Sequence, residues 1–109
     1  MKLDELDIIV KIAACVCGKD GVISQSEETK MFEVVSEFSP KYSAKRFNIV
    51  LDAFFDENTQ IEEYLEFVKE YKAKKFCIDL CKKSASADGL DIKENIALHK
   101  VKLILGEVL

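Results

Sequence analysis

Residues that break helices are scarce in this chain. Its 109 residues include one proline and four glycines, whereas hydrophobic residues make up 49% of the sequence. This composition is typical of a globular domain, and the scarcity of proline and glycine favours helices over a loop-rich fold. At this length the chain is expected to form a single domain, residues 1–109, around one core.

Long uncharged stretches are also missing. The longest run without a charged residue in a predicted helix, from Ile12 to Gly18, is far shorter than the ~20 apolar residues that cross a bilayer. The N-terminus carries Asp4 and Glu5 where a signal peptide would carry basic residues and then an apolar stretch. We therefore expect no membrane span and a cytoplasmic protein.

The chain has no excess of positive charge. A net charge of −4 argues against a general nucleic-acid binder, but the charge is uneven. Residues 52–66 hold six acidic residues and no basic one, and residues 69–83 hold six lysines and two acidic residues. Such runs usually form solvated faces, although the basic segment can also contact phosphates or an acidic partner. The acidic segment can meet the basic segment of a second copy, which would favour a homodimer.

Catalytic machinery is not visible either. The single histidine, His99, falls on the polar side of a predicted helix, and no serine, cysteine or carboxylate partner can be assigned to it from spacing. A glycine-rich loop that could cradle a phosphate is also missing. We expect the protein not to be an enzyme.

A helix-turn-helix phrase occurs twice in the chain. Residues 18–27 read Gly-Lys-Asp-Gly-Val-Ile-Ser-Gln-Ser-Glu, and residues 86–94 read Ser-Ala-Asp-Gly-Leu-Asp-Ile-Lys-Glu. A shift of 68 residues places Asp20 on Asp88, and after the glycine the shift becomes 67, so the second turn is one residue shorter. The sequence therefore predicts an internal duplication.

Apolar residues recur at helical spacing throughout. We expect helices at about 3–17, 24–38, 43–55 and 92–108. The segment 60–87 could form one long helix or two joined near residues 71–73, and we favour two, because one helix of roughly 40 Å is too long for a domain of this size. The first helix is apolar around most of its circumference, which predicts a central position. In the last helix we expect six apolar residues to face inward: Ala97, Leu98, Val101, Ile104, Leu105 and Val108. The predicted fold is all-α, a compact bundle of about five to seven helices built from two pseudo-symmetric helix-turn-helix repeats.

Each repeated turn has a structural explanation. Gly21 and Gly89 can supply the left-handed conformation that ends a helix. Ser24 with Glu27 forms a capping box that opens the next helix, and residues 91 and 94 repeat this pattern. Each cap is worth about 1 kcal/mol, so the capping residues need no ligand to explain them.

The same turns also suggest a cation site. The phrase resembles the back half of an EF-hand loop, but two oxygen ligands are missing from the first copy, and the second has Asn95 where the bidentate glutamate belongs. A less specific site remains possible, because carboxylates that share one rim would attract a divalent cation such as Ca²⁺ or Mg²⁺. The candidate ligands are Asp20, Glu27, Asp88, Asp91 and Glu94.

These residues resemble the TerB-like family, the tellurite-resistance protein B domains. The family signature is an alanine-rich helix end followed by Ala-Asp-Gly-x-Ile-Ser-x-x-Glu, given twice in an all-helical domain of about this length. The first copy is similar through Asp20, Gly21, Ile23, Ser24 and Glu27, with Lys19 in place of the usual alanine. The second is similar through Ala87, Asp88 and Gly89 and then departs by one residue before Glu94.

The resemblance implies a role in association. It implies a module of bacterial tellurite or chemical stress response or of phage defence, which binds partner proteins and has no enzymatic activity of its own. It also implies that Asp20, Glu27 and Asp88 contribute to binding of a divalent metal. The alternative is a metal-independent adaptor or self-associating scaffold that uses the acidic segment 52–66 and the basic segment 69–83.

Four cysteines offer a further metal hypothesis. Cys77 and Cys81 are one helical turn apart and could bind zinc together with Cys15 and Cys17. However, Cys15 and Cys17 point about 200° apart on a helix, so both cannot face one ion. We expect reduced, buried thiols that pack as small hydrophobic groups.

Overall fold

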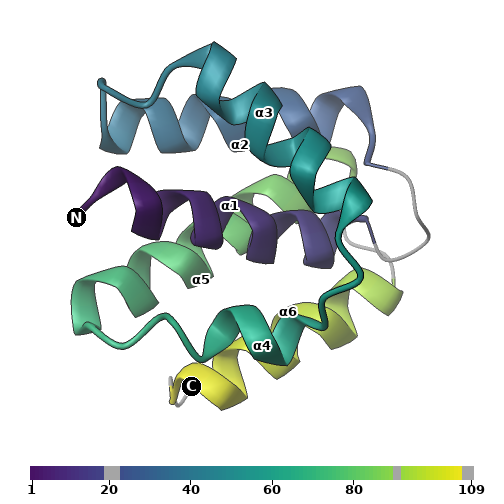
Figure 1. Ribbon diagram of the computed structural model, residues 1–109. Helices are drawn as coiled ribbons and strands as arrows, with labels where there is room; N and C mark the ends of the chain where they lie inside the picture. Colours follow the sequence, from purple (N-terminus) through teal and green to yellow (C-terminus); the bar gives the residue numbers. More distant parts are fainter. Residues whose placement is uncertain (19–22, 90–91, 107–109) are drawn as a thin grey trace.

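The chain folds into a bundle of helices (Figure 1). The structure is a computed structural model, and it describes residues 1–18, 23–89 and 92–106. Within these ranges the regular structure is entirely helical, as predicted. The elements are α1 (Leu3–Cys17), α2 (Gln25–Phe38), α3 (Ala44–Asp56), α4 (Ile61–Leu65), α5 (Tyr71–Ala85), the 3₁₀ turn η1 (Ser86–Asp88) and α6 (Ile92–Leu105). No helix among the described residues is long and apolar enough to span a membrane.

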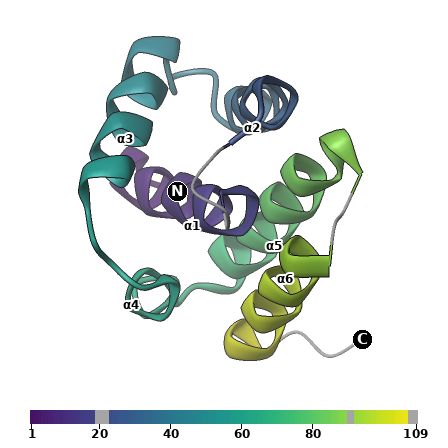
Figure 2. The same ribbon diagram turned by 90° about the vertical axis from the view of Figure 1, so that its right-hand side faces the viewer.

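Helix α1 lies at the centre of the bundle, as its apolar circumference predicted. It contacts each of the other five α-helices, and Figure 2 shows α3 and α4 on one side of it and α2, α5 and α6 on the other. Its buried residues are Leu6, Ile9, Val10, Ile12, Ala13, Ala14, Val16 and Cys17. The largest part of the core therefore forms around this helix.

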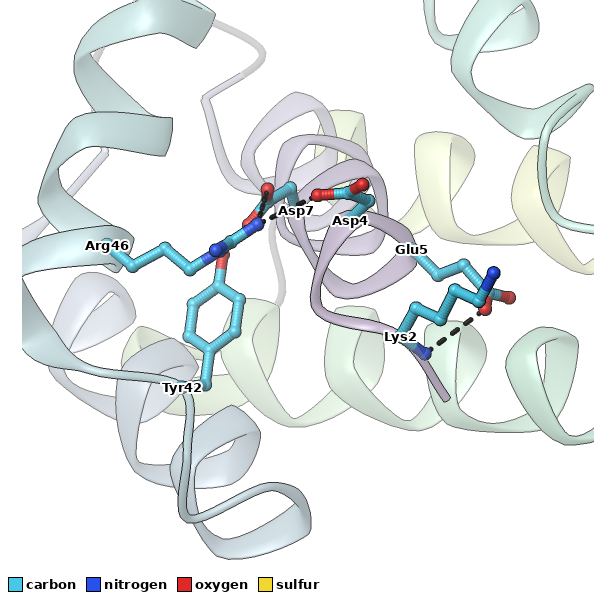
Figure 3. A network of polar contacts seen from close by, with 6 residues as sticks. All are labelled: Lys2, Asp4, Glu5, Asp7, Tyr42 and Arg46. Atoms are coloured by element: carbon cyan, nitrogen blue, oxygen red, sulfur yellow. Dashed lines mark hydrogen bonds and ion pairs between the residues drawn. The ribbon is translucent and has the colours of Figure 1, made fainter.

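Two acidic side chains of α1, Asp4 and Asp7, bind residues of α3 and of the segment before it (Figure 3). The Tyr42 hydroxyl donates to Asp7 Oδ1 at 2.8 Å. The Arg46 side chain donates to the same carboxylate twice, from Nε to Oδ1 at 2.9 Å and from Nη2 to Oδ2 at 2.7 Å. Nη2 of Arg46 also reaches Asp4 at 3.0 Å. These contacts fix the rotation of α1 relative to α3.

A second polar contact ties α1 to the end of α3 and to α4. Lys11 Nζ lies 2.7 Å from Glu57 Oε2, and the buried Tyr64 hydroxyl donates to the other Glu57 oxygen. The hydrogen bond from Lys11, and then that from Tyr64, hold the pKa of Glu57 below its usual value. The charged side chains of Asp4, Asp7 and Lys11 in α1 therefore each pair with an oppositely charged group, and Asp7 also accepts a hydrogen bond from a tyrosine hydroxyl.

The two buried tyrosines predict loss of stability at alkaline pH. Burial, and then the hydrogen bond to Glu57, raise the pKa of Tyr64 to about 12; burial and the hydrogen bond to Asp7 raise that of Tyr42 as well. In the unfolded chain the tyrosine hydroxyls lose their protons near pH 10, whereas in the folded protein they keep them to higher pH. The contribution of the two tyrosines to the free energy of unfolding is therefore complete below pH 10 and falls as the pH rises toward 12. We expect the urea midpoint to fall over this range, and to fall less steeply in Tyr42→Phe and Tyr64→Phe variants. An equal slope in all three proteins would contradict this assignment.

Some helix limits agree with the predictions and others do not. Helix α2 ends before Pro40, as predicted. The segment 60–87 forms two helices, but the break covers residues 66–70 instead of 71–73, because Tyr71 already begins α5. The inward position predicted for Ile104 is wrong, since this side chain is 46% exposed, and Val108 lies outside the described residues. Helix α6 carries apolar side chains around its circumference, so contacts with α1, α4 and α5 decide which side is buried.

Candidate metal centre

The first repeated turn opens α2 through a capping box. The Glu27 backbone N–H donates to Ser24 Oγ at 3.1 Å, and the Ser24 N–H donates to Glu27 Oε1 at 3.0 Å. This is the predicted pairing. Glu27 is nonetheless only 4% exposed. The capping box therefore places an acidic residue that is buried in the protein.

The second repeated turn delivers an equivalent glutamate. Gly89 follows η1 with φ +83°, a positive value at which glycine is favoured, as predicted, but its ψ of 135° differs from that of a left-handed helical cap. Helix α6 then begins at Ile92, and Glu94 is its third residue, as Glu27 is the third residue of α2. Glu94 is 6% exposed. Both turns therefore place a buried glutamate in the first turn of the helix that follows.

The two glutamates meet at the end of α1. One carboxylate oxygen of Glu27, one of Glu94 and the Sγ atom of Cys17 all lie within 4.8 Å of one another. In the described part of the chain, this is the one group of three or more cysteine, histidine or acidic residues close enough to share a metal ion. We call these three residues the turn cluster.

The other predicted ligands lie elsewhere or outside the described residues. Asp88 is exposed at the end of η1 and is not part of the turn cluster. It is near enough that its charge helps to raise the pKa of Cys17. Asp20 and Asp91 fall outside the described residues, as does Gly21.

From the sequence, Cys17 was considered only as a ligand of a four-cysteine zinc site, and its place beside Glu27 and Glu94 was not predicted. Its position as the last residue of α1, directly before the first turn, was the available signal. Because Cys15 and Cys17 point about 200° apart on α1, they lie in different surroundings. The same angle argues against a four-cysteine zinc site. Cys17 is buried in the turn cluster, whereas Cys15 is partly exposed.

Electrostatics in the turn cluster favour a positive charge. Burial, then the negative charges of Glu27, Glu94 and Asp88, raise the pKa of the Cys17 thiol far above its usual value. The charges of Glu27, Glu94 and Asp88 therefore give this end of α1 a negative potential, which attracts cations. Two carboxylates and a sulfur form a donor set that divalent metals such as Zn²⁺ accept.

The remaining cysteines behave as core residues. None of the four cysteines forms a disulfide, and Cys77 and Cys81 are buried on α5, as predicted, whereas Cys15 is partly exposed. A hydrogen bond with Cys77, together with burial, raises the pKa of Cys81 well above its usual value. A thiol in this environment is a poor nucleophile.

Comparison with known proteins adds no relative. No family model, no curated protein and no solved structure matches this chain. The site must therefore be interpreted from its own residues.

Proposed function

We propose that this protein is a non-enzymatic helical interaction module with a divalent-cation site at its two repeated turns. The observation that carries the proposal is the convergence of Glu27 and Glu94 with Cys17, within 4.8 Å, inside the protein surface. Carboxylate oxygens and a thiolate sulfur are ligands that divalent metals bind in proteins, and the three donor atoms lie close enough to share one ion. A role in a bacterial stress or defence complex is the context that the TerB-like resemblance implies.

An internal duplication accounts for this convergence. Helices α1 and α5 both have 15 residues, and α2 and α6 both have 14. Glu27 and Glu94 hold the same position in the second helix of each pair. We infer two pseudo-symmetric repeats, in which one ancestral acidic position now supplies both carboxylates.

The thiol affects which metal the site prefers. Ca²⁺ and Mg²⁺ take oxygen ligands and would use the two carboxylates alone, whereas Zn²⁺ also accepts sulfur. With Cys17 in the turn cluster, we expect Zn²⁺ to bind more tightly than Ca²⁺ or Mg²⁺. A Cys17→Ala variant should reduce this preference.

The proposal predicts opposite effects of one substitution with and without metal. Glutamine can keep the capping hydrogen bond of Glu27 but has no charge. In EDTA, Glu27→Gln is therefore expected to unfold at or above the wild-type temperature, and Glu94→Gln is the second variant tested. With Zn²⁺ at about 100 times its dissociation constant, the wild type should gain about 3 kcal/mol, or about 10 °C or more in midpoint, and both variants should gain much less. Thermal unfolding followed by circular dichroism measures both series.

A matched control is available on α4. Glu63 is exposed, so Glu63→Gln removes the same charge without touching the turn cluster and should respond to Zn²⁺ like the wild type. Asp20→Asn and Asp88→Asn test whether the other predicted carboxylates take part. Equal metal responses of the wild type and both cluster variants would refute the cation site.

A metal-independent adaptor is the second candidate function. The feature that favours it is a lysine-lined hollow surface along α5, which is separate from the turn cluster. Binding there would continue in EDTA and weaken with salt.

A further inference from the structure

The lysine-lined surface of α5 consists of two adjoining hollows, which we together call the basic hollow. One measures about 520 Å³ and the other about 670 Å³, and they share Lys75 and Ile78. The lysines that line them are Lys69, Lys72, Lys74, Lys75 and Lys82. Each volume lies in the range of about 300 to 1,000 Å³ that is typical of binding pockets.

The smaller hollow combines this positive charge with an aromatic wall. Phe38 of α2 stacks on Phe76 of α5 with ring centroids 4.1 Å apart, and both line the hollow. Asp79 also lines it, but this carboxylate is paired with Lys83 at 3.1 Å. The surface is therefore suited to an aromatic side chain with negative charges beside it.

Helix α3 presents such a group, which we call the acidic knob. Asp52, Phe55 and Asp56 are spaced i, i+3 and i+4, so they share one face of the helix. All three are exposed, and the Phe55 side chain keeps 53% of its surface accessible. An exposed aromatic ring between two carboxylates is complementary to the basic hollow in charge and in apolar character.

The knob and the hollow of one molecule are not placed to meet. Helices α3 and α5 lie on opposite sides of α1 in both views (Figures 1 and 2). Contact between the two surfaces therefore requires two molecules. Because the surfaces differ, the contact is heterologous, so an open assembly keeps one free hollow at one end and one free knob at the other.

We propose that the acidic knob of one molecule docks into the basic hollow of a second copy of this chain. Phe55 enters beside Phe38 and Phe76, and the carboxylates of Asp52 and Asp56 face the surrounding lysines. This names a partner for the interaction module proposed above and rests on that role, although not on the cation.

Sedimentation velocity over a concentration series tests the proposal. The wild type should associate at about 20 mM salt, and the association constant should fall about tenfold or more at about 500 mM salt. Reversing the charge of the knob, Asp52→Lys with Asp56→Lys, should abolish association. Reversing that of the hollow, Lys72→Glu with Lys75→Glu, should do the same. An equimolar mixture of the two variants should associate again, because the unaltered knob of the hollow variant can dock into the unaltered hollow of the knob variant, and the two reversed surfaces are complementary as well.

Matched controls separate this contact from a general effect of charge. Lys41 and Lys45 are exposed and do not line the hollow, so Lys41→Glu with Lys45→Glu changes the net charge as much as the hollow variant but should preserve association. Phe55→Ser should weaken association, whereas Phe67→Ser, at another exposed phenylalanine, should not. Circular dichroism confirms that each variant is folded.

Three results would overturn the inference. The first is a wild type that stays monomeric at low salt. The second is a loss of association in the Lys41 and Lys45 control that equals the loss in the hollow variant. The third is a mixture of the knob and hollow variants that does not associate. Vesicles containing phosphatidylserine and polyuridylate serve as competing probes; a monomeric protein that binds either one through Lys72 and Lys75 would assign the hollow to that occupant instead. The Zn²⁺ response of the charge-reversed variants shows whether the cation site survives independently.

Discussion

An Ile12→Ala variant is expected to lose about 4 kcal/mol of its free energy of unfolding. Ile12 is completely buried in α1, which contacts all five other α-helices. A cavity there cannot close without moving several helices at once, so the cost should lie in the upper part of the range of about 2 to 5 kcal/mol for such changes. Since small domains have only about 5 to 15 kcal/mol in total, the variant should be marginally stable. Urea unfolding measures the loss.

The control for this variant is the same substitution on the surface. Ile96 on α6 is 63% exposed, so Ile96→Ala should change the stability by less than about 0.5 kcal/mol. A loss below about 1 kcal/mol for Ile12→Ala would mean that α1 is not the centre of the core.

An Asp7→Ala variant is expected to lose about 2 to 3 kcal/mol. Asp7 accepts hydrogen bonds from Tyr42 and from two nitrogens of Arg46. Tyr42 is 1% exposed, so its hydroxyl would remain buried without this acceptor, and that desolvation is the main cost. Chemical denaturation of the variant measures the effect.

Asp4 provides a matched control because it binds the same arginine from the surface. Its side chain is 91% exposed in the ion pair with Arg46, so Asp4→Ala should cost less than about 0.5 kcal/mol. Adding Tyr42→Phe to Asp7→Ala removes the orphaned hydroxyl and should recover part of the stability. If the two aspartate variants are equally stable, the Tyr42 hydroxyl is not the source of the loss.

Local signals made most of the fold predictable. Ser24 with Glu27 begins α2, Pro40 follows its end, and the apolar circumference of α1 indicated its central place. The break between α4 and α5 was misplaced because residues 66–70 contain no proline or glycine. Burial of Val68 within this connection depends on distant parts of the chain, and no local signal encodes it.

The site was only partly predictable for the same reason. The capping pattern singled out Glu27 and Glu94 as residues, but their proximity depends on how α2 and α6 pack around the end of α1. In the sequence Cys17 lies next to Cys15, but in the folded protein it lies beside Glu27 and Glu94. Periodicity shows that these cysteines point apart, but not which of them faces the carboxylates.

The central position of α1 has a consequence for synthesis. Its 15 residues are made before the other helices of the bundle, and α5, which packs extensively against it, begins only at Tyr71. At about 5 to 20 residues per second, several seconds pass before the ribosome supplies that partner. During this time α1, whose side chains are apolar apart from Asp4, Glu5, Asp7 and Lys11, has few of its final neighbours, so the bundle can close around it only after α5 has emerged.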